Sequence, residues 1–235
     1  MPVSEPLSKC QQEVANEPAS RPEILLVSLH KQPNFDESYR RLLSGLCMVA
    51  HLHRAERPST ALIHLSENPA AVLVTDPGIA AIPHGEVQTK LREYVNGGGT
   101  VIFAFHFPSF THGVGMGVFF STVLDLPWER GDFHRTTFTL NPRAVNNLPS
   151  TRRLAPSYSL KAFHLKNVSP DAAIYLPGPE STVESPIFLP LPCPIQHPDQ
   201  TPVAWAQVGQ GWVGYIGDVN AERETTDVIL SMCGL

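Results

Sequence analysis

The first half of the chain alternates between short apolar runs and segments with helical periodicity. The apolar runs are nearly continuous, which is typical of strands buried on both faces of a parallel sheet. They predict strands at residues 24–29, 49–56, 70–76 and 100–105. The periodic segments predict helices at residues 35–48, 58–66 and 86–96. Strict alternation of this kind indicates right-handed βαβ units, and therefore an α/β fold with helices on both faces of the sheet.

The second half changes character. Apolar and polar residues alternate or form short runs that predict strands at residues 133–140, 160–168 and 172–176. Residues 202–207 and 212–216 flank a Gly-containing turn and predict a β-hairpin. A closing helix is expected at residues 222–233. We expect one α/β domain over residues 23–235, with a mostly parallel sheet and an antiparallel C-terminal hairpin, after a flexible arm at residues 1–22.

Composition and charge exclude several classes of protein. The 235 residues carry a formal net charge of −5, and no basic stripe is present, so nucleic acid is not an expected partner. No apolar run approaches the roughly 20 residues of a membrane span, and residues 1–22 lack the apolar core of a signal peptide. The four cysteines are scattered without a CxxC pair, which indicates a reducing compartment. We therefore expect a cytoplasmic protein.

Three segments resemble a known superfamily. Residues 91–102 (LREYVNGGGTVI) are similar to the helix, glycine cluster and strand before the nucleophile turn of class I glutamine amidotransferase-like proteins. Residues 72–76 (VLVTD) are similar to the preceding strand, and residues 202–217 (PVAWAQVGQGWVGYIG) to the terminal hairpin. The resemblance is nearest to the ThuA-like branch of that superfamily. It implies a flavodoxin-like fold over most of the chain.

The resemblance also implies where catalysis would occur, and there this chain departs from the pattern. In the superfamily a Cys follows the fourth strand, and a His-x-Glu follows the final hairpin. A cysteine nucleophile needs such a neighbouring base to become a thiolate near neutral pH. Here the turn reads HFPSF at residues 106–110, without cysteine, and residues 218–222 read DVNAE. If Glu222 is the acid, then Asn220 stands in place of the base. Glutamine hydrolysis by the family mechanism is therefore not expected.

Polar residues at the ends of the predicted strands are the remaining catalytic candidates. His106 follows the fourth apolar run, at the end of a strand where open α/β sheets bind ligands. His30 and Asp76 follow the first and third runs, so the three side chains could hold Zn²⁺ or Fe²⁺, or could equally cap strand ends. Ser109 and His112 lie in the loop after His106, but a nucleophile–base pair is defined by geometry and not by this spacing.

The remaining candidates are glycines, aromatic residues and pocket-lining residues. Residues 113–117 (GVGMG) lack the spacing and the lysine of phosphate-binding loops, so we interpret them as a tight turn. The phenylalanines around this loop favour core packing, with an apolar pocket or partner surface as the alternative. The residues expected to line a ligand pocket are His30, Phe107, His112, Asp218, Asn220 and Glu222.

Taken at this level, the sequence favours a degenerate member of the amidotransferase-like fold that acts as a binding or scaffolding protein. Its partner would be a small-molecule ligand or another protein. A further possibility is a homo-oligomer that forms through the Phe-rich loop. The alternative is a hydrolase or another small-molecule-modifying enzyme that uses His106 with Asp76, His30 or Ser109, with or without a metal. No organic cofactor is implied.

Overall fold

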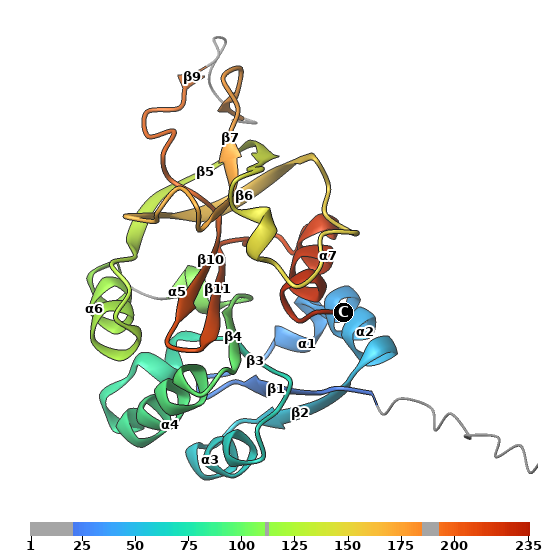
Figure 1. The fold of residues 1–235 in the computed structure, drawn as a ribbon, viewed down its shortest axis with the longest axis vertical. Coiled ribbons are helices and arrows are strands. Elements are labelled where there is room, and N and C mark those ends of the chain that lie inside the picture. The colour runs from blue at the N-terminus through green and yellow to red at the C-terminus, as the bar shows by residue number, and fades with distance from the viewer. Residues whose placement is uncertain (1–20, 111–112, 185–192) are drawn as a thin grey trace, which may run out of the picture.

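The computed structural model describes residues 21–110, 113–184 and 193–235. Most of the expected N-terminal arm lies outside these residues, as does His112. The chain forms a nine-stranded sheet in the order β2-β1-β3-β4-β11-β10-β7-β5-β6, and two short strands, β8 and β9, pair separately (Figure 1). The strands of the large sheet are β1 (Glu23–Val27), β2 (His51–Ala55), β3 (Ala71–Val74), β4 (Thr100–Phe103), β5 (Glu129–Leu140), β6 (Ser157–Lys166), β7 (Ala173–Pro177), β10 (Val203–Val208) and β11 (Gly211–Ile216). The short strands are β8 (Thr182–Val183) and β9 (Cys193–Pro194).

The sheet has a parallel part and an antiparallel part. β2, β1, β3, β4 and β11 run parallel to one another. The β10–β11 hairpin reverses the direction, and β7, β5 and β6 continue with antiparallel pairing. This confirms the predicted α/β class with its mostly parallel core and its antiparallel hairpin. The antiparallel part extends further than expected, because three strands join the sheet beyond the hairpin.

Helices cover both faces of the sheet, each with its own hydrophobic core. The helices are α1 (Phe35–Ser38), α2 (Arg40–Val49), α3 (Pro58–Ser66), α4 (Gly85–Asn96), α5 (Phe107–Phe110), α6 (Gly113–Leu124) and α7 (Arg223–Met232). One core joins α1, α2 and α7, which lie together in Figure 1, and the other joins α3, α4 and α6. Ile24 and Leu26 of β1 enter the first core, whereas Leu25 and Val27 enter the second. Two-sided burial thus explains why this strand reads as a continuous apolar run.

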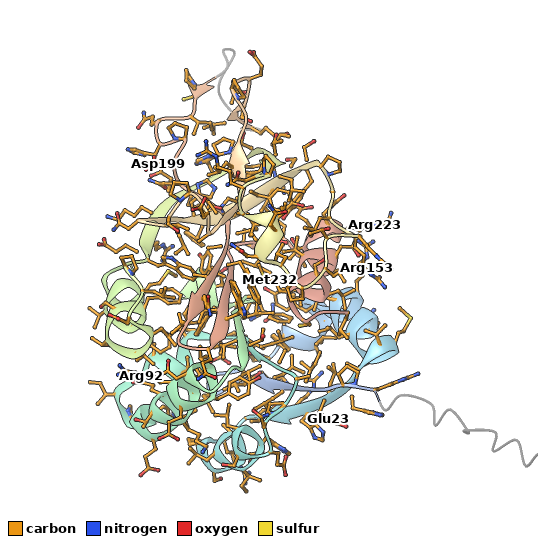
Figure 2. The ribbon with its side chains drawn as sticks, in the orientation of Figure 1. Glu23, Arg92, Arg153, Asp199, Arg223 and Met232 are labelled. Carbon is orange, nitrogen blue, oxygen red and sulfur yellow. The ribbon has the colours of Figure 1, made fainter. Side chains whose placement is uncertain are left out.

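The C-terminal helix α7 fixes the hairpin against the first core. Met232, near the end of α7, is buried, and its Sδ packs against Gly214 of β11 (Figure 2). The hairpin turns through Gly209, whose φ of 59° lies in the left-handed region that glycine adopts without strain. The predicted hairpin and closing helix are both confirmed to within two residues at each end.

Two local predictions were wrong. Residues 113–117 are the first turns of helix α6 and not a tight turn. The helix buries Met116, Phe119, Phe120 and Val123, a spacing that places all four on one helical face. Their burial in the second core offsets the low helix propensity of the glycines. The predicted helix at residues 35–48 is interrupted at Tyr39, between α1 and α2. No helix among the described residues is long and apolar enough to cross a membrane.

Candidate functional site

The carboxyl ends of β1, β3, β4 and β11 meet at one edge of the parallel sheet. Open α/β sheets bind their ligands outside this edge, because the strand-to-helix loops converge there. The polar residues that follow these strands include Ser28, Asp76, His106 and Asp218. Backbone hydrogen bonds hold the ends together, since His106 N donates to Thr75 O at 2.9 Å. We call this region the carboxyl edge.

Phe105 occupies the sharp turn between β4 and α5. Its φ is 61°, a left-handed conformation that is unusual for a bulky residue. The side chain is only 3% exposed and points into the first core, where its ring centroid lies 5.5 Å from that of Phe35 and 4.9 Å from that of Tyr39. A strained strand-to-helix turn is the geometry that exposes a nucleophile in several hydrolase folds. Here the turn holds a buried hydrocarbon ring. The sequence carries no local signal of this backbone conformation.

Asp76 is a buried carboxylate that organises the loop after β3. Its Oδ1 accepts hydrogen bonds from His30 N at 2.9 Å and from Gly78 N at 2.8 Å. Burial raises its pKa above the usual range, although these hydrogen bonds oppose the shift. Its Oδ2 has no hydrogen-bond partner among the described residues. Asp76 therefore caps a backbone turn with one oxygen, while its other oxygen is buried.

The histidines at this edge do not converge on a metal site. His106 packs edge-on to Phe35 and Tyr39, with ring centroids 5.8 and 5.0 Å apart, and burial lowers its pKa. His30 is exposed and contacts Asp76 through its backbone N–H. Within the described residues, no three His, Cys, Asp or Glu side chains come close enough to hold a metal ion. The structure therefore does not group His30, His106 and Asp76 as a ligand set.

Ser109 and Phe107 lie in the short helix α5 after the sharp turn. Ser109 is partly buried, and its backbone N–H donates to His106 O at 3.2 Å. Phe107 is 0% exposed and packs against Phe103 of β4, with ring centroids 4.8 Å apart. Phe107 is thus a core residue and does not line a pocket or present a partner surface, which corrects its expected place in a ligand pocket. His112 lies outside the described residues.

Asp218 anchors the segment that follows β11. It is 3% exposed, and its carboxylate accepts hydrogen bonds from Asn220 N at 2.8 Å, from Glu222 N at 2.7 Å and from Thr225 Oγ1 at 2.5 Å. Burial raises its pKa despite these bonds. This carboxylate therefore joins the end of β11 to the first turn of α7, and its hydrogen bonds are structural.

The segment after β11 also pairs with β6 and reaches a large cavity. Val219 N donates to Lys161 O at 3.1 Å, and Phe163 N donates to Gly217 O at 3.0 Å. Beyond this contact lies a cavity of about 680 Å³. Its lining residues are Phe133, His134, Arg135, Lys161, Val183, Glu184 and Asn220. We call it the β5–β8 cavity. Among the described residues that were predicted to line a ligand pocket, Asn220 alone lies in this lining, and the sequence reasoning missed the other lining residues.

A polar network forms one wall of the β5–β8 cavity. Arg135 pairs with Glu222 and donates to Ser159 Oγ at 3.1 Å. Ser159 in turn donates to Glu184 Oε2 at 2.8 Å. Glu222 was predicted to line a pocket. It does not lie in the lining of this cavity, but its ion pair positions Arg135, which does. Arg135 therefore pairs directly with Glu222 and is linked to Glu184 through Ser159.

Lys161 and Phe133 form another part of the lining. The Lys161 ammonium lies 5.2 Å from the Phe133 ring centroid, within the range of a cation–π contact. No carboxylate among the described residues pairs with it. Phe133 is 46% exposed and stacks on Phe163 with ring centroids 4.1 Å apart. The cavity therefore offers a cation beside an accessible aromatic ring, a combination suited to a ligand with an apolar body and an acidic or polar group.

The buried His164, which packs against the cavity-lining His134, makes stability depend on pH. His164 of β6 packs at 90° against His134 of β5, with ring centroids 4.3 Å apart, and burial lowers the pKa of His164 to about 3. The folded state keeps His164 neutral, whereas the unfolded chain binds a proton below about pH 6.5. Its contribution to stability is therefore complete above that pH and is lost as the pH falls.

We expect the free energy of unfolding to drop by about 2 kcal/mol between about pH 7 and pH 5 from His164 alone. Urea denaturation at a series of pH values measures this slope. The His164→Leu variant should show a flatter dependence, whereas the exposed control His51→Ala should retain the slope of the wild type. An unchanged slope in His164→Leu would show that His164 is not the source.

Comparison with known proteins gives similarity at the level of the fold. No protein-family model matches the sequence, and no curated protein matches it. Among solved structures, a putative ThuA-like protein from Bacteroides uniformis aligns with a TM-score of 0.59 at 10% identity, over 93% of each chain. A putative ThuA-like protein from Parabacteroides merdae aligns with a TM-score of 0.53 at 12% identity, over 92% of this chain and 88% of that chain. A cytoplasmic protein from Salmonella typhimurium aligns with a TM-score of 0.50 at 14% identity, over 89% and 95% of the two chains.

These likenesses cover nearly the whole chain, so this protein has the fold of ThuA-like proteins. The fold agrees with the resemblance that the sequence motifs indicated. At 10–14% identity the likeness defines the architecture and leaves function to be argued from the site.

Proposed function

We propose that this protein is a non-hydrolytic member of the amidotransferase-like fold that binds a small molecule in the β5–β8 cavity. The observation that carries the proposal is Phe105, which fills the sharp turn after β4 with a buried ring. On the proposed alignment this turn is the nucleophile position of the superfamily. Asn220 stands at the proposed base position and has no imidazole to take up a proton. A single cytoplasmic domain over residues 23–235 belongs to the same proposal, and the described Cys47, Cys193 and Cys233 are free thiols.

The β5–β8 cavity supports a binding role because it adjoins the carboxyl edge and combines apolar with polar groups. Its volume of about 680 Å³ falls within the roughly 300–1,000 Å³ typical of small-molecule sites. The end of β11 supplies Asn220 to the lining, so the cavity lies against the segment in which the superfamily carries its base. The protein can therefore lack the catalytic groups of the superfamily and still bind a ligand in the adjoining β5–β8 cavity.

Ammonia release from glutamine tests the non-hydrolytic half of this proposal. We expect the purified protein to release ammonia no faster than buffer, because neither Phe105 nor Asn220 can form an acyl-enzyme or transfer a proton. His106→Ala should give the same baseline. Ammonia release that saturates with glutamine and depends on the protein would contradict the proposal.

A second candidate function is a hydrolase centred on His106 and Asp76, with His30 or Ser109 in support. The observation in its favour is the unpartnered Oδ2 of the buried Asp76, whose pKa is raised by burial as in many general acids. Hydrolysis of the ester p-nitrophenyl acetate by the purified protein tests this candidate. Turnover that is lost in His106→Ala, with no change in unfolding midpoint, would favour this candidate over the binding protein.

A further inference from the structure

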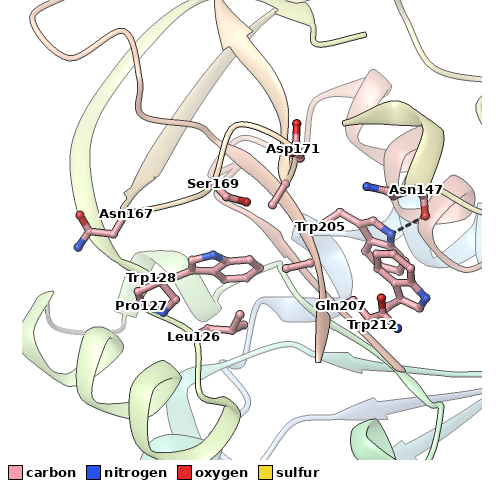
Figure 3. Close-up of a pocket in the computed structure, with 12 residues that line it drawn as sticks. Leu126, Pro127, Trp128, Asn147, Asn167, Ser169, Asp171, Trp205, Gln207 and Trp212 are labelled. Atoms are coloured by element: carbon pink, nitrogen blue, oxygen red, sulfur yellow. Dashed lines mark hydrogen bonds between the residues drawn. The ribbon is translucent and has the colours of Figure 1, made fainter. Parts of the chain in front are cut away.

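The β5–β8 cavity and a second cavity differ in whether their aromatic side chains are open to a ligand. All three tryptophans of the chain lie around the second cavity, which has a volume of about 370 Å³ (Figure 3). Trp128 and Trp205 are 2% and 1% exposed, because Trp128 packs in the second core and Trp205 in the first. Trp212 stacks on Trp205 with an interplanar angle of 4°. These indole rings therefore serve core packing and offer a ligand little surface.

In the β5–β8 cavity, by contrast, an aromatic ring is exposed. Among the described Phe, Tyr and Trp side chains, Phe133 is the only exposed one. It lies opposite Phe163 in the pairing of β5 with β6, and the two rings stack at an interplanar angle of 20°. The guanidinium of Arg130 lies over the Phe163 ring, 3.7 Å from its centroid. Phe133 is therefore the accessible end of a fixed aromatic stack, on which a further ring can pack.

Two cations lie side by side next to this stack. Arg135 of β5 and Lys161 of β6 are cross-strand partners, and like charges in that position repel each other. Glu222 is the counter-ion of Arg135, and both members of this ion pair are largely buried. No carboxylate in the described part of the chain pairs with Lys161, whose ammonium lies near the Phe133 ring. An anion bound beside Lys161 would therefore supply the missing counter-ion and reduce the repulsion.

Glu184 limits the charge of the anion that this cavity favours. Thr137 and Ser159 form the next cross-strand pair on the same face of the two strands. Thr137 Oγ1 donates to Glu184 Oε1 at 3.1 Å, and Ser159 Oγ donates to Glu184 Oε2 at 2.8 Å. These neutral hydroxyl groups hold the Glu184 carboxylate in the lining without cancelling its charge. A singly charged anion is therefore favoured over a dianion such as a phosphate monoester, since Glu184 would repel the second charge.

We propose that the ligand of the β5–β8 cavity is an aromatic monocarboxylate, whose ring packs on Phe133 and whose carboxylate pairs with Lys161. This inference rests on the proposed function and deepens it, because it names the class of compound held in the same cavity. An aromatic ring suits Phe133 better than an alkyl chain does, since ring edges and faces attract each other. Val183 adds apolar surface, and the volume of about 680 Å³ accommodates a ring with a short acidic side chain.

Isothermal titration calorimetry of the full chain tests this class of ligand with benzoate, phenylacetate and cinnamate. We expect saturable binding of at least one of these acids. Phenylacetamide keeps the ring but lacks the charge, and acetate keeps the charge but lacks the ring. Each should bind about tenfold more weakly than phenylacetate, and phenyl phosphate should also bind more weakly. The proposal is overturned if none of the three acids binds saturably, or if phenylacetamide or phenyl phosphate binds as tightly as the acids.

Variants assign the two contacts to their side chains. Lys161→Gln removes the charge and should weaken binding of the acid by about tenfold or more, whereas Lys161→Arg keeps the charge and should restore most of the affinity. Phe133→Ala removes the exposed ring and should weaken binding by about threefold to tenfold. Lys166→Ala, on the same strand but outside the cavity lining, should bind the acid as the wild type does. Equal affinity of Lys161→Gln and the wild type would contradict the proposal.

The identity and the fate of the bound compound distinguish this inference from the proposed function. A cell-extract compound that is retained unchanged through Lys161, and that is not an aromatic acid, would overturn the inference and leave the proposed function standing. An aromatic acid that binds at Lys161 and is then converted to a product would support the ligand class and contradict the proposed function.

Discussion

Phe105→Ala is expected to lower the free energy of unfolding by about 3–5 kcal/mol, the usual cost of truncating a buried phenylalanine. The ring is 3% exposed and contacts Phe35 and Tyr39, so its removal leaves a cavity where α1 and α2 meet the sheet. Urea denaturation of wild type and variant measures the difference. A loss below about 1 kcal/mol would show that the side chain contributes little to packing.

Phe105→Gly separates the packing of Phe105 from the strain in its backbone. Glycine adopts the observed φ of 61° without steric cost, whereas alanine in the same conformation is strained by about 1 kcal/mol. We therefore expect Phe105→Gly to be more stable than Phe105→Ala by about 1 kcal/mol, although both remove the ring. If Phe105→Ala were the more stable of the two, the left-handed turn would not be present in solution.

Asp218→Ala is expected to lower the free energy of unfolding by about 3 kcal/mol or more. In the wild type, three donors bond to this one buried carboxylate, and the variant leaves all three without an acceptor. The loss should separate the first turn of α7 from the end of β11. Thermal unfolding and circular dichroism measure the stability and the helix content of the variant. Burial raises the pKa of Asp218, so its charge is costly, and the three hydrogen bonds offset part of that cost.

Two milder variants test this account of Asp218. Asp218→Asn keeps an acceptor oxygen and the volume, so it should cost less than Asp218→Ala. Thr225→Val removes a single donor to the carboxylate and should cost about 1 kcal/mol. Equal stability of Asp218→Ala and the wild type would mean that the segment after β11 is held by its backbone pairing with β6 alone.

The parallel half of the fold could be predicted from the sequence because two-sided burial leaves a clear pattern. The runs that became β1, β3 and β4 are apolar at successive positions, and α3 was predicted at its observed bounds, Pro58–Ser66. Helix α6 was missed because its glycines suggested a turn. Burial of Phe119 and Phe120 in the second core outweighs the low helix propensity of these glycines. That burial depends on the tertiary structure and leaves no local signal in the sequence.

The sequence could predict only those residues of the candidate site that directly follow a parallel strand. Asn220, which was expected in a ligand pocket, lies in the lining of the β5–β8 cavity because it follows the last parallel strand. Lys161 and Val183 were not foreseen, since they come from antiparallel strands whose order in the sheet had no sequence signal. The left-handed turn at Phe105 was also missed, because a phenylalanine gives no local indication of a positive φ.

The central claim is that this protein binds a small molecule in the β5–β8 cavity without converting it. The most direct test incubates the protein with a small-molecule cell extract, recovers it by gel filtration, and identifies retained and consumed compounds by mass spectrometry. Lys161→Ala removes the cavity cation, and Lys166→Ala, on the same strand but outside the cavity lining, is the matched control. We predict a compound that is retained and recovered unchanged, and whose retention falls in Lys161→Ala but not in Lys166→Ala. A compound consumed by the wild type, with product formation lost in His106→Ala, would contradict the account.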